Sequence, residues 1–161
     1  MNPEKIIIRK AVEADYEAIN SLYYRTYSLY HENIPDCYKE TPKTVLSRGD
    51  FINILDSEDD IMLVAEDDGK VIGQLYGMVE HYEGGDVTTD YHRAEVAELS
   101  VDPEYERIGV GSKLIEEVEK WTKEKKLCDL AVLTYAFNKK AISFYEANGY
   151  EQYSIKLQKK I

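Results

Sequence analysis

Hydrophobic and polar residues follow two different periods along this chain, and each period predicts its own kind of element. Apolar residues at alternate or consecutive positions, rich in β-branched types, are typical of strands. Apolar residues spaced three or four apart, with charges between them, are typical of amphipathic helices. These patterns predict strands at residues 6–9, 61–65, 71–79, 94–101, 130–135 and 150–157, and helices at residues 15–30, 109–126 and 138–147.

The stretch between the first helix and the second strand predicts one more helix. Thr41 is a good N-cap and Pro42 suits the first helical position. Apolar residues such as Leu46 and Phe51 follow at helical spacing. We therefore expect a helix that begins at Pro42, preceded by a loop over residues 30–40.

The order of the predicted elements indicates an α/β fold. Three strands follow one another closely, and Asp68-Gly69, between the first two of them, is a pair typical of tight hairpins. Strands and helices then alternate to the end of the chain. This order is typical of a mixed, mostly antiparallel sheet with helices on both faces. Since no repeat or linker interrupts the 161 residues, we expect a single α/β domain over residues 1–161.

The charge balance of the chain is strongly acidic. Its 20 basic residues stand against 31 acidic ones, which gives a formal net charge of −11 at pH 7. Because no excess of basic residues is available to neutralise phosphates, a nucleic-acid partner is not expected. The acidity suits a cationic substrate, but surface charge also keeps proteins soluble, and we favour this second interpretation.

The cysteines and histidines indicate no metal site. Cys37 and Cys128 lie far apart and form no C-x-x-C pair, and the three histidines show no H-x-x-x-H spacing. The sequence also contains no secretory leader and no apolar run long enough to span a bilayer. We therefore expect a reduced, cytoplasmic protein without membrane contact.

The most informative motif is a glycine-bearing loop between a predicted strand and a predicted helix. Residues 102–113 read D-P-E-Y-E-R-I-G-V-G-S-K. Free backbone N–H groups and the helix dipole at such a junction favour an anion. Gly109 and Gly111 would leave room for a diphosphate, so we expect a pyrophosphate site here. A bare tight turn is the alternative for this motif taken alone.

A second motif connects this loop with a known family. The loop, followed by F-N-K-K-A-I-S-F-Y-E-A-N-G-Y at residues 137–150, strongly resembles the GNAT superfamily of acyl-CoA-dependent N-acetyltransferases. Residues 6–19 and 94–101 resemble the family as well. The resemblance implies acetyl-CoA as co-substrate, an amine acceptor, and a central pair of parallel strands, 94–101 and 130–135, that splay apart. A homodimer would be compatible with it.

The resemblance also implies which residues bind coenzyme A. The pantetheine arm would pair with the backbone of Leu99 and Val101 and contact Asn138, which can also cap the following helix. Glu106 stands where the family pattern has Gln or Arg, so we expect its carboxylate to point away from the diphosphate. The pyrophosphate would bind backbone N–H groups, helped by an arginine guanidinium, in the segment formed by Arg107, Ile108, Gly109, Val110, Gly111 and Ser112.

Acetyl transfer to an amine needs a base for the amine and an acid for the departing thiolate. Tyr145 lies where many family members carry that acid, and the alternative for it is a core aromatic residue. Ideal alternation places Glu95 and Glu98 on opposite faces of their strand, with Glu98 facing away from Leu99 and Val101. We therefore favour Glu98 as the base, acting through water, although a bulge would reverse the choice.

The acceptor pocket is expected between the first two helices and the central strands. Tyrosine-rich residues 23–36 and residues 78–82 would wall it, and Tyr27, His31 and Glu95 are the candidate contacts.

Two hypotheses about function follow from these residues. The first is an acetyl-CoA-dependent N-acetyltransferase that acts on a primary amine of a small molecule, peptide or protein. The second is a GNAT-like module that binds acyl-CoA without turnover, as a sensor or interaction partner. A nucleotide-phosphate binder of another fold is a third, less favoured interpretation, since the sequence has neither a P-loop nor the third glycine of the Rossmann fingerprint.

Overall fold

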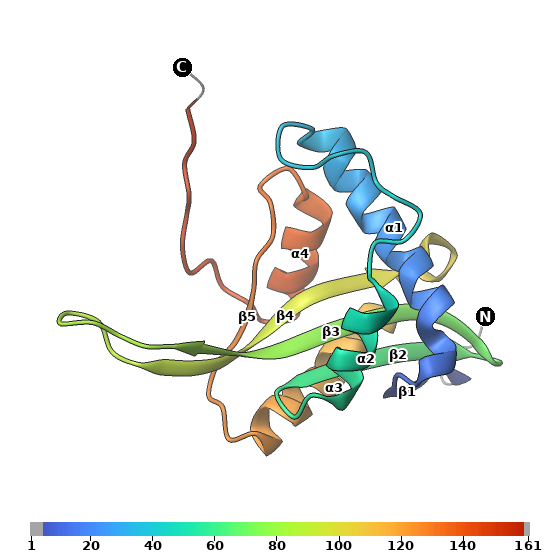
Figure 1. The fold of residues 1–161 in the computed structure, drawn as a ribbon, viewed down its shortest axis with the longest axis horizontal. Helices are drawn as coiled ribbons and strands as arrows, with labels where there is room; N and C mark the ends of the chain where they lie inside the picture. The colour runs from blue at the N-terminus through green and yellow to red at the C-terminus, as the bar shows by residue number, and fades with distance from the viewer. Residues whose placement is uncertain (1–4, 160–161) are drawn as a thin grey trace.

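The computed structural model describes residues 5–159 and shows one sheet of five strands (Figure 1). These strands are β1 (Ile7–Lys10), β2 (Asp60–Asp67), β3 (Lys70–Tyr82), β4 (Tyr91–Val101) and β5 (Leu130–Val132). They follow the order β1-β2-β3-β4-β5, and each neighbouring pair is antiparallel except β4 and β5, which are parallel. The mixed, mostly antiparallel sheet expected from the sequence is therefore confirmed.

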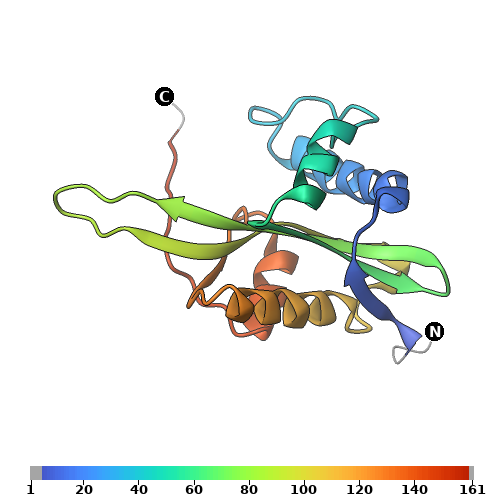
Figure 2. The ribbon, with the colours of Figure 1, turned by 60° about the horizontal axis from the view of Figure 1, so that its bottom comes forward.

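Helices cover both faces of this sheet, as predicted (Figure 2). The first two helices, α1 (Tyr16–Asn33) and α2 (Arg48–Asp56), lie on one face. The other two, α3 (Val110–Glu124) and α4 (Lys139–Ala147), lie on the opposite face. The molecule thus has three layers, with the sheet in the middle.

Each face of the sheet buries its own apolar core. On the α3 side, Leu63 of β2 belongs to a cluster with Leu114 of α3. On the α1 side, Val64 of β2 belongs to a cluster with Ile19 of α1 and Phe51 of α2. All five side chains are at most 1% exposed. Because successive strand residues point to opposite faces, one short apolar run in β2 serves both cores.

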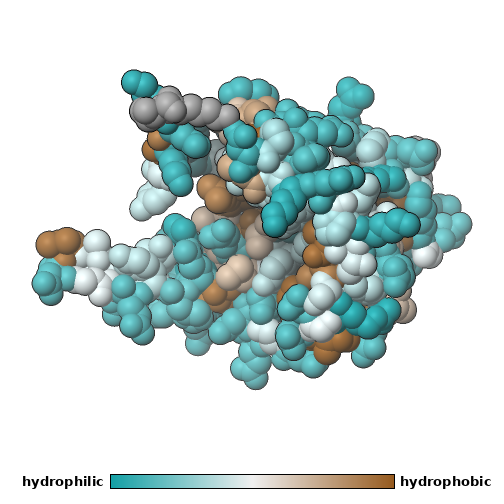
Figure 3. Space-filling view, turned by 45° about the horizontal axis from the view of Figure 1, so that its top comes forward, coloured by the Kyte–Doolittle hydropathy of each residue, from teal (hydrophilic) through white to brown (hydrophobic). Residues whose placement is uncertain are grey.

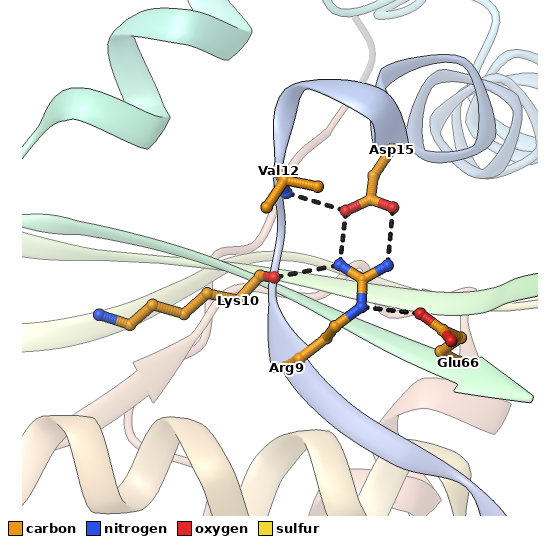
Figure 4. A network of polar contacts seen from close by, with 5 residues as sticks. All are labelled: Arg9, Lys10, Val12, Asp15 and Glu66. Atoms are coloured by element: carbon orange, nitrogen blue, oxygen red, sulfur yellow. Dashed lines mark hydrogen bonds and ion pairs between the residues drawn. The ribbon is translucent and has the colours of Figure 1, made fainter. Parts of the chain in front are cut away.

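A polar network fixes the point where α1 leaves the sheet (Figure 4). The Arg9 guanidinium on β1 donates two hydrogen bonds to the Asp15 carboxylate, at 2.7 and 2.9 Å, and one to Glu66 on β2, at 2.7 Å. The Asp15 carboxylate also accepts the Val12 N–H at 2.8 Å. The hydrogen bonds from Arg9 lower the pKa of Asp15. The network therefore ties β1 and β2 to the 3₁₀ turn η2 (Glu13–Asp15) ahead of α1.

The prediction that a helix begins at Pro42 is wrong, because α2 begins only after an N-cap at Ser47. The Asn20 side chain on α1 accepts hydrogen bonds from the N–H groups of Val45 and Leu46, at 3.0 and 3.1 Å. These bonds hold the preceding stretch as a loop. A long-range contact thus overrides the local signal for a helix start.

Of the two last predicted strands, the first is shorter than expected and the second is absent. β5 ends at Val132 instead of residue 135, and residues 150–159 form no strand. The alternation of apolar residues such as Tyr153 and Leu157 suits a strand, but these side chains are 91% and 90% exposed. A strand needs a neighbour to pair with, and this segment runs away from the sheet (Figure 1).

β3 and β4 extend beyond the predicted 71–79 and 94–101 and form a long two-stranded arm (Figure 1). Tyr82 and Tyr91 stack on it with ring centroids 4.8 Å apart, and Val87 in the turn is 96% exposed. Figure 3 shows a mostly hydrophilic face, with one apolar spot at the tip of the arm and further apolar residues near the centre.

Candidate active site at the splayed strands

β4 and β5 separate in the middle of the sheet. Residues 94–96 pair with residues 130–132, but residues 98–101 of β4 pair with β3 alone among the described strands. The chain after β5 turns toward α1, where the rings of Tyr135 and Tyr30 lie 5.5 Å apart. The splayed pair expected from the family resemblance is therefore present, and it leaves an open strand edge on β4.

An aromatic cluster holds the opening apart. The rings of Tyr30 and Tyr38 lie 5.1 Å apart, and the hydroxyls of Tyr38 and Tyr135 form a hydrogen bond at 3.0 Å. His31 adds to the cluster, since its Nδ1 lies 2.9 Å from the Tyr38 carbonyl oxygen. Because these contacts tie the segment after β5 to the end of α1, they explain why β5 stops early.

Leu99 and Val101 lie on the open part of β4. Their half-buried side chains pack against the core on the α3 side, and they stand opposite Leu75 and Gly73 of β3. Their backbone belongs to the edge that β5 does not cover, as pairing with an extended pantetheine arm requires. Their contact with the arm stays a prediction.

A bulge in β4 decides which face its acidic residues take. Tyr76 of β3 pairs with Glu98, and the next β3 residue, Gly77, pairs with Val96, so Ala97 is an extra residue. Val96 is buried in the core on the α3 side, whereas Tyr76 packs toward α1 and α2. Glu98 therefore faces α1.

Glu98 is buried and lines a cavity of about 270 Å³. It is 7% exposed, and burial raises its pKa to about 8, while a hydrogen bond with Thr26 acts in the opposite direction. A carboxyl group that titrates near neutral pH suits a general base. The cavity lies between α1, α2 and the central strands and is lined by Tyr23, Tyr27, Val45, Leu46, Ile54, Tyr76, Ala97 and Glu98.

The same bulge corrects the expectation that Glu95 and Glu98 lie on opposite faces. With Ala97 as an extra residue, both side chains point toward the α1 side of the sheet. Glu95 does not line the cavity. Its carboxylate oxygen Oε2 lies 3.9 Å from the guanidinium nitrogen Nη2 of Arg93. Burial raises the pKa of Glu95, and the charge of Glu80 adds to this effect. Of the two candidates, only Glu98 reaches the cavity.

Of the two predicted pocket residues on α1, Tyr27 and His31, only one lines the cavity. Tyr27 lines the cavity, whereas His31 lies in the aromatic cluster with its Nδ1 at the Tyr38 carbonyl oxygen. Tyr27 also contacts that cluster, with its ring centroid 5.9 Å from that of Tyr38. Tyr27 therefore contacts both the cavity and the aromatic cluster between β4 and β5, whereas His31 contacts only the cluster.

The glycine loop has the backbone shape expected of an anion site. It contains the 3₁₀ turn η3 (Pro103–Tyr105), after which Arg107 and Gly109 take positive φ angles of 60° and 90°. Left-handed residues in such a loop turn neighbouring N–H groups toward one side, and α3 begins directly after Gly109. Apart from its chain neighbours, no described atom lies within 4 Å of where a Cβ on Gly109 would stand. The loop therefore has open space for a ligand beside Gly109, and binding of a diphosphate there stays a prediction.

The side chains of the loop divide between core and surface. Ile108 packs against the core and Val110 is 1% exposed, so these residues can offer only backbone groups to a ligand. The Arg107 side chain is exposed, and Ser112 is half-buried in the first turn of α3. Arg107 and Ser112 are thus the loop side chains that the core does not enclose, and their contact with a phosphate stays a prediction.

Helix packing explains Gly111. A Cβ at this position would lie 3.0 Å from two ring atoms of Phe144 on α4, so α3 and α4 approach closely here. Room for a ligand is found at Gly109 instead, where both the φ angle and the open space require glycine.

Glu106, the departure from the family pattern, is paired with a cation. Its carboxylate lies 2.5 Å from Nζ of Lys140, in the first turn of α4. This pairing balances its charge and reduces the repulsion that a nearby diphosphate would meet.

Tyr145 and Asn138 lie on α4 and at its start. The Tyr145 ring is 8% exposed and packs between Phe144 and Tyr150, at centroid distances of 5.2 and 5.3 Å. Burial raises the pKa of Tyr145, and the negative charge of Glu98 raises it further. The Asn138 side chain accepts an N–H of the first turn at 3.1 Å, so its predicted role as helix cap is confirmed.

Several residues of the site carry no signal in the sequence. A hydrogen bond with Thr26 lowers the pKa of Glu98. Ile54 of α2 and Tyr76 of β3 line the cavity. Helical spacing marks Ile54 as a buried residue but does not say against what it packs. The cavity forms only because the loop before α2 folds back onto α1, through the Asn20 contacts.

Carboxyl, hydroxyl and ring groups make up the candidate site. Within residues 5–159, no group of three or more His, Cys, Asp or Glu side chains is placed to hold a metal ion. Over the same residues, none of the helices combines the length and apolar character that crossing a bilayer needs.

Known proteins share both the sequence pattern and the fold. The profile of the acetyltransferase (GNAT) family matches residues 20–150, and the chain therefore belongs to this family. A mutant of the BH1408 protein from Bacillus halodurans superposes with a TM-score of 0.91 at 19% identity. The match covers 96% of this chain and 99% of that chain.

Two aminoglycoside acetyltransferases have the same fold. AAC(6')-Iy in complex with CoA matches with a TM-score of 0.71 at 19% identity, over 96% of this chain and 100% of that chain. The enzyme meta-AAC0020, from an uncultured soil metagenomic sample and in complex with sisomicin, gives a TM-score of 0.70 at 18% identity, over 98% and 97%. At these identities the likeness establishes the fold.

Proposed function

We propose that this protein is an N-acetyltransferase that moves an acetyl group from acetyl-CoA to a primary amine of a small molecule, peptide or protein. The observation that carries the proposal is the position of Glu98. Its buried carboxyl group lines a cavity at the point where β4 loses its partner β5. At this point the Glu98 carboxyl would lie close both to an amine bound in the cavity and to a thioester bound along the open edge of β4. The CoA bound to the similar AAC(6')-Iy supports the choice of donor.

The donor would be held by the open edge and the glycine loop. Leu99 and Val101 would pair through their backbone with the pantetheine arm, and Asn138 would contact it from the start of α4. The N–H groups of residues 107–112 would bind the pyrophosphate. Bound in this way, acetyl-CoA supplies an activated carbonyl group for attack by the amine.

Proton transfer would couple two residues of the chain. Glu98 would take a proton from the amine, directly or through water, and its pKa of about 8 suits this role near neutral pH. Once protonated, Glu98 no longer carries the charge that helps to raise the pKa of Tyr145. Tyr145 then becomes a better acid for the departing thiolate, so proton uptake at one residue favours proton donation at the other.

A module that binds acyl-CoA without turnover is a second candidate function. The burial of Tyr145 favours it, because a ring that is 8% exposed among other aromatic rings is typical of a core residue. Its raised pKa also weakens it as an acid.

Release of free CoA separates the two functions. The protein is incubated with acetyl-CoA and a panel of primary amines, and the thiol product and the acetylated amine are both followed. We expect amine-dependent CoA release, and Glu98→Gln should lower kcat roughly 10²-fold or more, because the amide cannot take the proton. Saturable CoA binding without amine-dependent release from any amine would favour the binding module.

A further inference from the structure

The cavity beneath α1 and α2 is small and mostly apolar. Its volume of about 270 Å³ lies at the small end of the range for ligand pockets. Val45 and Leu46, from the loop before α2, and Ile54 of α2 form apolar walls. Tyr23 and Tyr27 add two nearly parallel rings, 8° apart, with centroids separated by 6.2 Å.

One buried polar group, the Glu98 carboxyl, lines this cavity, and a second, the Tyr23 hydroxyl, is enclosed beside it. Tyr23 is 5% exposed, and its hydroxyl has no hydrogen-bond partner among the described residues. Native proteins rarely leave a buried hydroxyl without a partner unless a ligand or water supplies one. Glu98 is close enough for its charge to add to the effect of burial in raising the pKa of Tyr23. An amino group in the cavity would offer a hydrogen bond to the Glu98 carboxyl.

The cavity can neutralise one positive charge. Among the described residues that line it, Glu98 is the only carboxyl group. Asp60, on β2, does not line the cavity, and its carboxylate accepts a hydrogen bond from the Tyr76 hydroxyl at 2.8 Å. A second ammonium group in the cavity would therefore meet apolar walls without a partner, which is costly.

We propose that the acceptor is a small primary monoamine with an apolar, flat body. This inference rests on the proposed function, because it takes the cavity as the acceptor site. The amino group would lie against Glu98, and the body would pack against Leu46, Ile54 and the ring of Tyr27. Such an acceptor differs from sisomicin, the ligand of the similar meta-AAC0020, which carries several amino groups on several rings.

Binding and turnover are measured separately with 2-phenylethylamine, spermidine and sisomicin as probes. Calorimetric titration in the presence of CoA reports binding, and CoA release from acetyl-CoA reports turnover. We expect 2-phenylethylamine to bind most tightly and its kcat/KM to exceed those of the two polycations at least about tenfold. Tighter binding of a polycation, or a higher kcat/KM for one, would overturn the inference. Selective binding of 2-phenylethylamine without CoA release would support this ligand class and contradict the proposed function.

A matched pair of variants tests the cavity itself. Ile54→Glu adds a second carboxylate to the wall, so the ratio of kcat/KM for 2-phenylethylamine to that for spermidine should fall more than about tenfold. Val87→Glu adds the same charge at the arm, at a residue that is 96% exposed, and should leave the ratio unchanged. A rise in melting temperature with CoA shows that each variant is folded. An unchanged ratio in folded Ile54→Glu would contradict the assignment of the cavity.

Discussion

Glu98 is the residue that we propose as the base, and its burial should be visible in the stability of the fold. Burial raises its pKa from an ordinary 4.5 to about 8. Between these values the unfolded chain has lost the proton while the folded protein keeps it. The folded state therefore loses stability as the pH rises from about 4.5 to about 8, and Glu98 adds no further loss above that range.

Glu98→Gln should remove this pH dependence. At about pH 8.5 the variant should be more stable than the parent protein by on the order of a few kcal/mol, because it carries no buried group that prefers to ionise. At about pH 4 the two proteins should differ little, since the parent carboxyl is then mostly neutral in both states. Urea unfolding at both pH values measures the difference. If the two proteins differed in free energy of unfolding by the same amount at both pH values, Glu98 would not be a buried ionisable group.

Tyr145→Phe should lower kcat with little change in CoA affinity. The substitution keeps the ring that packs between Phe144 and Tyr150 and removes only the proton donor. Loss of a general acid costs roughly 10²- to 10⁴-fold in rate. Steady-state kinetics with an acceptor amine, together with CoA titration, measures both effects. An unchanged kcat, where chemistry limits turnover, would leave Tyr145 with a packing role only.

Sequence motifs predicted the local backbone features of the candidate site, but not the orientation of its acidic side chains. The glycine loop and the Asn138 cap depend on local backbone chemistry, which a short motif contains. The face taken by Glu95 depends on one extra residue, Ala97, in β4. A bulge is defined by pairing with the neighbouring strand, so strict alternation along one strand could not reveal it.

At the scale of elements, the junction of the glycine loop with α3 is the part of the fold most open to a direct test. Gly109 and Gly149 have nearly the same φ angles, 90° and 87°, and neither has a described atom within 4 Å of its Cβ position, apart from chain neighbours. An alanine at either position should therefore cost about 1 kcal/mol in backbone strain. Only Gly109 lies in the loop, so the two variants separate strain from ligand binding.

Gly109→Ala should weaken CoA binding roughly tenfold or more, since its methyl group would occupy the space expected for the diphosphate. Gly149→Ala, which alters the end of α4, should bind CoA like the parent protein. Calorimetric titration with CoA measures both affinities. Parent-like binding by Gly109→Ala would place the diphosphate elsewhere.

Helices and strands were predicted correctly from the sequence where the spacing of their apolar residues was regular. Their boundaries were missed where contacts between residues far apart in the sequence determine them. The spacing of apolar residues was sufficient for α3, which packs its periodic face on the sheet. The start of α2 depends on Asn20, whose side chain binds a stretch 25 residues further along the chain. The length of β5 likewise depends on Tyr135, which contacts α1 through Tyr30. A local pattern contains neither contact.

At the scale of the whole molecule, stability should come from the two cores and hardly at all from the exposed C-terminal segment. Phe51 is fully buried, whereas Tyr153, Ile155 and Leu157 are at least 76% exposed. Replacing these three by serine should change the free energy of unfolding by less than about 0.5 kcal/mol each. Phe51→Ala should cost about 3–5 kcal/mol. Urea unfolding measures both.

A loss from the triple serine variant as large as that from Phe51→Ala would mean that the segment is packed in solution. A second copy of the chain could cover this C-terminal segment. A homodimer was expected from the sequence and stays a prediction. Sedimentation of the parent protein at several concentrations would then establish whether such a dimer forms.

A crystal structure with CoA and 2-phenylethylamine bound together tests most directly whether donor and acceptor meet at the opening between β4 and β5. The pantetheine arm should run beside residues 97–101, and the pyrophosphate should accept N–H groups of residues 107–112. The amine nitrogen should lie about 3 Å from the Glu98 carboxylate. An amine on the α3 side of the sheet, or CoA bound away from the open edge of β4, would contradict the proposed site.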